Sequence, residues 1–177
     1  MESDHYLYSE DSSLLGSAMD TLSGGDVFLE IGVGGGRNLD RLLHKFKLVV
    51  GTDLNRDAIE NSGSRSVDFV IADRATCFRA KSFDAIAFNP PYLPSEVISD
   101  RTVDGGAGGM QIPLGFLTSA LEAIKPDGKI LMLTSNLGAT KKFEEYCSRS
   151  RLKAIKIAER NLFFETLFVY EVTKESP

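Results

Sequence analysis

The chain has 177 residues, of which 42% are hydrophobic and 25% are charged, and its formal net charge at pH 7 is −5. This length predicts one domain, residues 1–177, with a substantial core, and no apolar run approaches the roughly 20 residues of a membrane-spanning helix. The acidic balance argues against a large phosphate-binding surface, because nonspecific nucleic-acid affinity comes from clustered lysine and arginine.

The amino-terminal residues and the cysteines bear on the compartment. The opening sequence MESDHYLYSED is polar and acidic, the opposite of a secretory signal peptide. Cys77 and Cys147 are too few for a disulfide framework, and with only two histidines in the chain they offer no cluster at zinc-ligand spacing. We therefore expect a cytoplasmic or nuclear protein with buried or half-buried free thiols and no bound metal.

Apolar, β-branched runs alternate with helical patterns along the chain, which is typical of an α/β fold with a mostly parallel sheet and helices on both faces. Seven strands are predicted, at 27–31, 48–53, 68–72, 83–89, 129–134, 152–158 and 166–172. Helices are predicted at 11–22, 38–46, 55–61, 113–124 and 139–148. The glycine-rich segment 100–111 lacks periodicity and is expected to be a mobile loop, and the aromatic residues of 161–165 are expected in the core.

A glycine-rich turn follows the first predicted strand. Its sequence runs from Glu30 to Gly36, EIGVGGG, at the place where a doubly wound sheet binds its cofactor. The dinucleotide fingerprint G-x-G-x-x-G would need its third glycine at Arg37, so a nicotinamide cofactor is disfavoured. Glycines without a Cβ let the backbone approach a bound molecule. A turn that only links strand to helix is the alternative.

Acidic residues end the next two predicted strands. Asp53 lies 21 positions beyond Gly32, where a carboxylate can accept both hydroxyls of a ribose. Asp before Asn is also a common entry to a helix. Asp73 ends the third strand, and a simple turn residue is the alternative for it.

The fourth predicted strand ends in Asn89-Pro90-Pro91-Tyr92. Proline fixes φ and cannot donate to a sheet, so the strand must stop on a rigid turn, but strand termination explains neither Asn89 nor Tyr92. An amide or exocyclic amine is a poor nucleophile because its lone pair is delocalised. The Asn89 side-chain oxygen and the Pro90 carbonyl can accept its two N–H groups and direct the lone pair, and Tyr92 can stack on the planar group. These four residues are the candidate catalytic residues.

Together these motifs resemble the class I S-adenosylmethionine-dependent methyltransferases, and Asn-Pro-Pro-Tyr resembles the motif of their amino and amide N-methyltransferases. The resemblance implies S-adenosylmethionine as cofactor, S-adenosylhomocysteine as product and a Rossmann-like fold. It implies that Glu30 pairs with the methionine amino group, Asp53 with the ribose and Asp73 with the adenine amino group. The implied cofactor-binding residues are Glu10, Ser12, Glu30, Gly32, Gly34, Gly36, Asp53, Leu54, Asp73 and Asn89.

Residues 6–15, YLYSEDSSLL, resemble the Tyr-x-Pro-x-Glu-Asp-Thr-x-Leu-Leu segment of HemK-like enzymes that methylate eukaryotic and archaeal class-1 release factors, with the proline and threonine replaced. In that family the segment covers the cofactor site, which implies roles for Glu10 and Ser12. The resemblance extends to Val172. It implies methyl transfer to the side-chain amide nitrogen of the glutamine in a Gly-Gly-Gln loop, which would enter a narrow pocket between Asn89, Tyr92 and residues 101–111.

The same resemblance implies a heterodimer with a small zinc-binding activator subunit. From the composition and charge we expect no membrane and no direct nucleic-acid partner. Segment 67–71, predicted as an outer strand with apolar residues on both faces, could be covered by that subunit; an ordinary half-buried edge strand is the alternative. An RNA or DNA amino-methyltransferase with a partner-supplied recognition surface is the second hypothesis. A non-enzymatic scaffold is the third, and intact Glu30, Asp53 and residues 89–92 speak against it.

Overall fold

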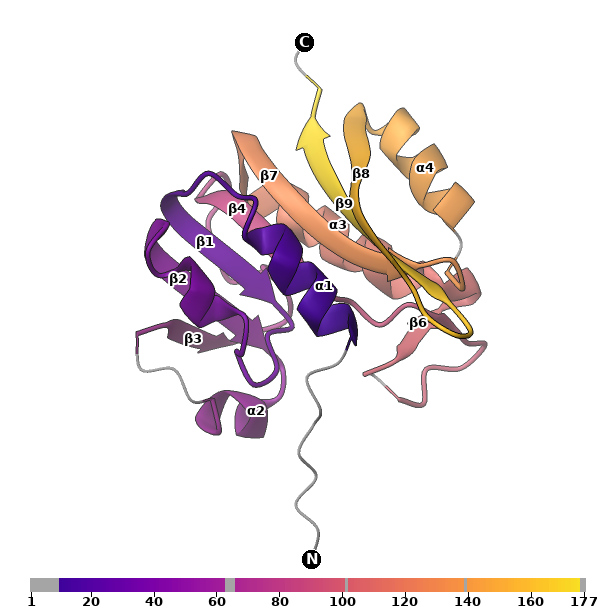
Figure 1. Cartoon of the computed structure of the whole chain (residues 1–177), viewed down its shortest axis with the longest axis horizontal. Coiled ribbons are helices and arrows are strands. Elements are labelled where there is room, and N and C mark those ends of the chain that lie inside the picture. Colours follow the sequence, from indigo (N-terminus) through magenta and orange to yellow (C-terminus); the bar gives the residue numbers. More distant parts are fainter. Residues whose placement is uncertain (1–9, 63–65, 101, 139, 176–177) are drawn as a thin grey trace, which may run out of the picture.

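The computed structural model describes residues 10–62, 66–100, 102–138 and 140–175. Seven strands form the main sheet in the order β3-β2-β1-β4-β7-β9-β8 (Figure 1). Their bounds are β1 Gly25–Ile31, β2 Phe46–Asp53, β3 Asp68–Ile71, β4 Phe83–Phe88, β7 Ile124–Ser135, β8 Leu152–Asn161 and β9 Thr166–Lys174. The first five are mutually parallel, and β9 runs antiparallel between β7 and β8. The predicted α/β class and all seven predicted strands are confirmed.

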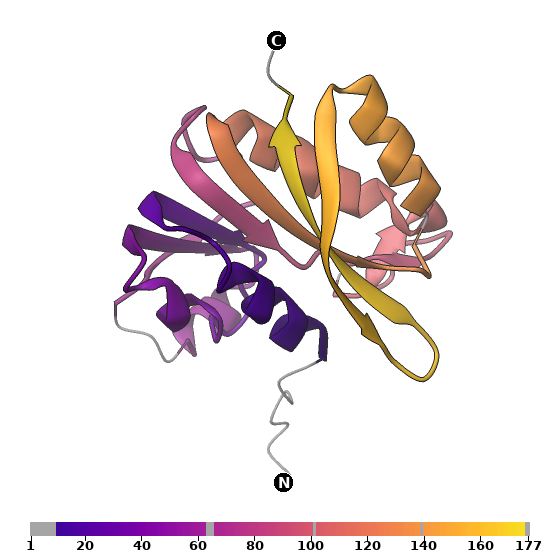
Figure 2. The ribbon, with the colours of Figure 1, turned by 45° about the horizontal axis from the view of Figure 1, so that its top comes forward.

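Four α-helices flank the sheet: α1 Glu10–Met19, α2 Arg56–Glu60, α3 Gln111–Ala123 and α4 Thr140–Arg149. Neighbouring residues of each strand point to opposite faces, so Phe28 packs with α1 in one core cluster and Leu29 packs with α3 and α4 in the other. Figure 2 shows α1 on one face and α3 on the other. In the described part of the chain, no helix is long and apolar enough to span a membrane.

The predicted helix at 38–46 is wrong. Only a 3-10 turn, Leu39–Leu42, forms there, and Phe46 already begins β2. The apolar spacing that suggested a helix is satisfied by that single turn, because Leu39 and Leu42 are both fully buried. The Phe46 ring instead meets Phe28 of β1, with ring centroids 5.4 Å apart.

Two short strands were not predicted. β5 (Leu93–Pro94) pairs in parallel with β6 (Asp104–Gly106), and a 3-10 turn, Ala107–Gly109, leads from β6 to α3. The segment expected to be a loop therefore folds back on the chain that follows the Asn-Pro-Pro-Tyr turn. The cysteine prediction holds for Cys147, which is buried, but is wrong for Cys77, which is exposed.

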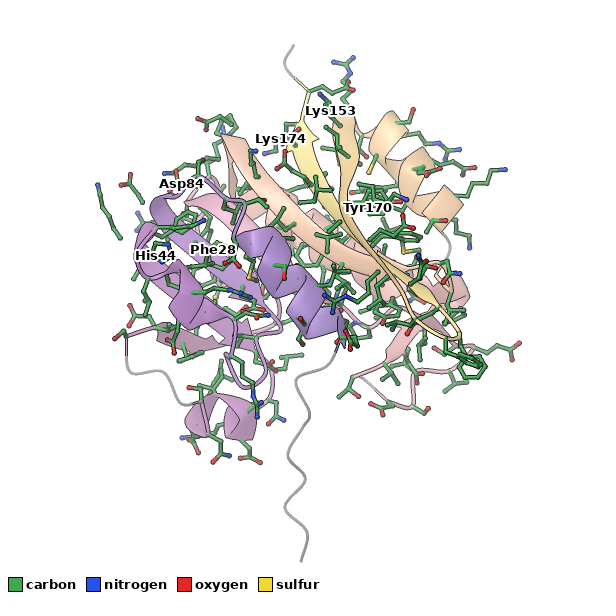
Figure 3. All side chains as sticks on the ribbon, viewed as in Figure 1. Phe28, His44, Asp84, Lys153, Tyr170 and Lys174 are labelled. Atoms are coloured by element: carbon green, nitrogen blue, oxygen red, sulfur yellow. The ribbon has the colours of Figure 1, made fainter. Side chains whose placement is uncertain are left out.

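Different features lie at the two ends of the parallel strands. At the amino ends of the parallel strands, Asp84 of β4 accepts N–H groups of Asp26 and Val27 at 2.9 and 2.8 Å and pairs with Lys125 at 2.6 Å. Figure 3 shows Asp84 away from the first turn of α1. At the other end, Ile31 of β1 lies beside Phe88 of β4. The glycine turn and the proline turn, which follow these two residues, therefore begin side by side.

Candidate active site

The glycine turn after β1 is held against the end of β2. Gly32, Gly34 and Gly36 have φ values of 70°, 51° and 68°, in the left-handed region that favours glycine. The Gly32 N–H donates to the Thr52 carbonyl at 2.7 Å, and the Gly34 N–H donates to Asp53 Oδ2 at 2.8 Å. A Cβ added at Gly34 would meet no atom within 4 Å. The backbone of the turn is therefore accessible at Gly34, while hydrogen bonds to Thr52 and Asp53 hold the turn in place.

Asp53 fixes this turn while keeping acceptor capacity. Its Oδ2 accepts the Gly34 N–H and its Oδ1 accepts the Asn55 N–H, each at 2.8 Å. A carboxylate oxygen can accept two hydrogen bonds, so each oxygen can still take one from a hydroxyl group. Leu54, beside it, is exposed. The arrangement is compatible with the predicted ribose contact.

Glu30 is the most unusual titratable group of the site. Its side chain is only 6% exposed, and its Oε2 has no hydrogen-bond partner among the described residues. Burial raises the pKa of Glu30 to about 8, although a hydrogen bond with Asn38 opposes the shift. A buried acid with an open lone pair suits a cationic ligand group, because a positive charge favours the carboxylate. This orphaned oxygen fits the amino group of the predicted cofactor.

Asp73 is placed differently from the other two acids. Its carboxylate forms a bidentate pair with the neighbouring Arg74, at 2.8 Å from both Nε and Nη2, and Arg74 has a φ of 55°. The backbone remains tied to the site, since the Ala72 N–H donates to the Asp53 carbonyl at 3.0 Å. The predicted contact of Asp73 with an adenine amino group stays a prediction. In that contact the Asp73 carboxylate would accept hydrogen bonds from both Arg74 and the adenine.

Asn89 is oriented by a residue that the sequence analysis did not select. Its Nδ2 donates to Asp11 Oδ2 at 2.8 Å, and Asp11 Oδ1 accepts the Ser12 N–H at 2.7 Å. A carboxylate can only accept, so the amide nitrogen of Asn89 must face Asp11. The Asn89 Oδ1 is left buried, with no partner in the structure described. Asp11 lies inside the motif of residues 6–15, and that position was the only signal that could have identified it.

Tyr92 is half-buried and packs against the core cluster beneath α1. Burial raises the pKa of its phenol, and the negative charges of Glu165 and Asp11 raise it further. The side chain therefore stays protonated at neutral pH, which excludes a phenolate base. Pro90 is buried and Pro91 is half-buried beside it.

The glycine-rich segment packs against the backbone of the Asn-Pro-Pro-Tyr turn. A Cβ on Gly105 would come within 2.8 Å of the Tyr92 Cα, and a Cβ on Gly109 within 2.3 Å of the Tyr92 carbonyl oxygen. These glycines therefore allow close backbone packing and are not simply the loose loop that we expected. A hollow of ≈ 420 Å³ adjoins the segment, lined by Pro94, Ser95, Glu96, Ala107, Gly108 and Gln111. Asn89 and Tyr92 do not line this hollow, in contrast to the predicted pocket.

Glu10 and Ser12 lie in the first turn of α1, on either side of the Asp11 that bonds Asn89. The Ser12 carbonyl accepts the Asn38 side-chain amide at 3.0 Å, which connects α1 to the residue that also bonds Glu30. The Glu10 carboxylate pairs with Arg160 of β8. The predicted cofactor contacts of Glu10 and Ser12 stay predictions, and the earlier part of their motif, residues 6–9, lies outside the described residues.

Comparisons with known proteins agree with this geometry. A family model described as a methyltransferase domain matches residues 29–90, from β1 through Pro90. The chain is 32% identical over 124 residues to a release factor glutamine methyltransferase of Bradyrhizobium diazoefficiens, covering 58% of this chain and 41% of that relative. It therefore spans less than half the length of this relative.

A second relative is covered more completely. A candidate protein N5-glutamine methyltransferase of Methanocaldococcus jannaschii is 34% identical over 149 residues, covering 77% of this chain and 75% of the relative. Among solved structures, a chain of the E. cuniculi Mtq2–Trm112 complex, which methylates the translation termination factor eRF1, is 25% identical. That match covers 94% of this chain and 96% of the other, with a TM-score of 0.79.

Proposed function

Because this chain belongs to the protein N5-glutamine methyltransferase family, we propose that it transfers a methyl group from S-adenosylmethionine to the side-chain amide nitrogen of a glutamine in a translation release factor. The fixed orientation of the Asn89 side-chain amide is the main support for this proposal. Its nitrogen is held by Asp11 at 2.8 Å, and its buried oxygen has no partner within the described chain. An acceptor oxygen fixed in this way suits a planar N–H₂ group.

The residues around the glycine turn fit the cofactor. Glu30 would hold the methionine amino group with its orphaned Oε2, and Asp53 would accept ribose hydroxyls with its remaining lone pairs. The open backbone at Gly34 would lie along the cofactor. When bound, S-adenosylmethionine supplies an electrophilic methyl group on a sulfonium whose positive charge is lost in the transfer.

The proline turn prepares the glutamine amide for this step. Asn89 Oδ1 and the Pro90 carbonyl each accept one amide N–H, which turns the nitrogen lone pair away from its delocalised arrangement and toward the methyl group. The prolines keep both acceptors in place before the substrate binds. Tyr92 stacks on the amide plane as a neutral phenol, so positioning and exclusion of water contribute more than a strong base does. The one proton that the methylated nitrogen loses is released to solvent.

We extend the proposal to a partner and a location. The Mtq2 relative forms a complex with Trm112, and we propose that this chain likewise forms a heterodimer with a small zinc-binding activator in the cytoplasm. The edge strand β3 offers a surface for it, since Ile71 is 52% exposed. Val67 was also expected on that surface, but its side chain is only 7% exposed and belongs to the core.

Transfer of a labelled methyl group distinguishes this function from nucleic-acid methylation. The heterodimer and the chain alone are given release factor, release factor with its Gly-Gly-Gln glutamine replaced by alanine, or RNA. We expect label only in the unmodified release factor, with more label in the presence of the activator. Label in RNA but not in release factor would contradict the proposal. Asn89→Ala should abolish turnover while cofactor affinity, measured by calorimetry, changes little.

A further inference from the structure

The connection between β8 and β9 exposes two adjacent aromatic side chains. Phe163 is 91% exposed and Phe164 is 85% exposed, the largest fractions among the large hydrophobic side chains in the described part of the chain. Their rings meet edge to face, with centroids 4.6 Å apart. The expectation that they lie in the core is therefore wrong. Two adjacent exposed aromatic rings form an apolar surface patch, and such patches can mark sites of protein interaction.

Several hydrogen bonds fix the conformation of the turn that carries these two rings. The Leu162 N–H donates to the Glu165 carbonyl at 2.8 Å, which closes the turn. The Thr166 N–H donates to the Asn136 side chain at 2.8 Å, and the Asn136 N–H donates back to the Thr166 carbonyl at 3.0 Å. Leu162 packs against the core cluster beneath α1. The two rings are thus held outward by an ordered turn, so binding would cost little conformational entropy.

This turn borders the residues that face the methyl acceptor. Arg160, just before it, pairs with Glu10, the neighbour of the Asp11 that orients Asn89. Glu165, just after the rings, raises the pKa of Tyr92 by its charge, and its Oε2 is buried with no partner among the residues described. In Figures 1 and 2 the end of the β8–β9 hairpin lies on the same side of the sheet as the first turn of α1.

The chemistry of this surface favours a protein. The neighbouring cation Arg160 is already paired with Glu10, and the chain has a net charge of −5, so the turn offers no cationic surface for nucleic acid. The turn follows β8, at the opposite edge of the sheet from β3, where we place the activator. A Gly-Gly-Gln loop has few side chains to contact, so recognition needs contacts outside the loop.

We propose that Phe163 and Phe164 form an aromatic ridge that docks an apolar surface of the protein carrying the methyl-accepting glutamine. This inference rests on the proposed function. The ridge binds the body of the substrate protein, beside the loop that enters the site, and so contributes to binding of the intact protein more than to the methyl-transfer step.

The test compares Phe163→Ser/Phe164→Ser with a matched control, Ile155→Ser/Ile157→Ser. The control removes two apolar side chains from β8 that are 44% and 38% exposed and lie outside the turn. Both variants are purified with the activator and assayed with intact release factor and with a short Gly-Gly-Gln peptide. We expect the ridge variant to raise the KM for release factor about tenfold or more, with kcat, peptide turnover and cofactor affinity unchanged and the control unaffected.

Direct binding provides a second measurement. The affinity for unmethylated release factor in the presence of S-adenosylhomocysteine should weaken by the same factor in the ridge variant. An unchanged KM and affinity would overturn the inference, as would an equal loss with peptide and protein. Loss of activator copurification, or a change in oligomeric state by sedimentation, would assign the ridge to another partner. If the unmodified heterodimer does not methylate release factor, the proposed function itself fails, which is seen before any variant is compared.

Discussion

The orientation of the Asn89 amide depends on a carboxylate that lies 78 positions earlier in the chain. An asparagine that can rotate about its last bond offers either N–H or C=O to a ligand, and only the oxygen can accept from an incoming N–H₂ group. Asp11 removes this ambiguity through a single charge-assisted hydrogen bond. We regard Asp11 as a positioning residue that acts through Asn89.

Replacing Asp11 with alanine should lower kcat about tenfold to hundredfold, because the Asn89 amide would then sample the unproductive orientation. Cofactor affinity by calorimetry should stay within about twofold. Asp11→Asn should recover part of the activity, since an amide oxygen can still accept from Asn89. Asp20→Ala, which breaks a surface ion pair with Arg41 beyond the far end of α1, is the control. Absence of rescue, together with lost cofactor binding, would indicate a general structural role instead.

We expect the buried acid Glu30 to couple cofactor binding to pH. Its pKa is raised from 4.5 to about 8, so between these pH values the folded protein holds a proton that the unfolded chain has lost. The contribution of Glu30 to stability therefore falls as pH rises through this window. A bound ammonium group favours the carboxylate and must displace that proton.

We therefore expect the affinity for S-adenosylmethionine to rise with pH up to about 8, approaching tenfold per pH unit well below that value. Calorimetry at pH 7 in buffers of different ionisation enthalpy should detect release of about one proton. Glu30→Gln should bind more weakly and release none from this position. A flat affinity profile between pH 6 and about 7.5 in the unmodified protein would contradict this coupling.

At the scale of elements, the pair β5–β6 and the following 3-10 turn serve as the base of the Asn-Pro-Pro-Tyr turn. The contact is between backbones, with the Leu93 N–H donating to the Val103 carbonyl at 2.9 Å and Gly109 lying against the Tyr92 carbonyl. Such close packing is possible only without a side chain.

Gly109→Ala should therefore displace the turn. The new Cβ would lie 2.3 Å from the Tyr92 carbonyl oxygen, and Gly109 has a φ of 69°. We expect a loss of about 2 kcal/mol in the free energy of unfolding and a large drop in kcat. Gly115→Ala in α3, whose nearest neighbour is the flexible end of Arg74, is the control and should be nearly neutral. Full activity of Gly109→Ala would show that the turn does not depend on this support.

The elements differ in how well the sequence predicts them. The seven main strands were found because each contains apolar, β-branched residues in a recognisable run, whereas β5 and β6 have two and three residues and contain proline and glycine. Asp53 and Asn89 were selected because each lies at the end of a predicted strand, and Glu30 was selected through the resemblance of the glycine turn to the first methyltransferase motif. Asp11 and the exposure of Phe163 were missed because the first depends on a contact across the chain and the second opposes the usual burial of aromatic residues.

For the molecule as a whole, the sheet has two edges, β3 and β8. We assign β3 to the activator and the turn that follows β8 to the substrate protein. The activator interface at β3 must be tested at Ile71, which is exposed. Val67 is a core residue, and Phe69 lies 3.0 Å from the position of a Cβ on Gly36, so changing either would disturb the fold or the glycine turn.

Ile71→Lys should reduce copurification of the activator, because a charge would be buried against it. Ile155→Lys on the opposite edge strand is the matched control. Equal recovery of the activator with both variants would place its interface away from β3. Thermal unfolding of the isolated chain should be similar for both, since both side chains are partly exposed.

The position of β9 has a consequence for the order of assembly. It follows β8 in the chain but lies between β7 and β8, so β8 gains a place in the sheet only through β9. We expect the β8–β9 hairpin to form locally and then to add to the preassembled parallel part of the sheet, β3-β2-β1-β4-β7, as one late folding step. In an intermediate arrested before that step, Glu30 of β1 and Asp53 of β2 would be in place, but Arg160 and the aromatic ridge would not yet be positioned. We expect such a species to bind S-adenosylmethionine but not to bind the protein substrate.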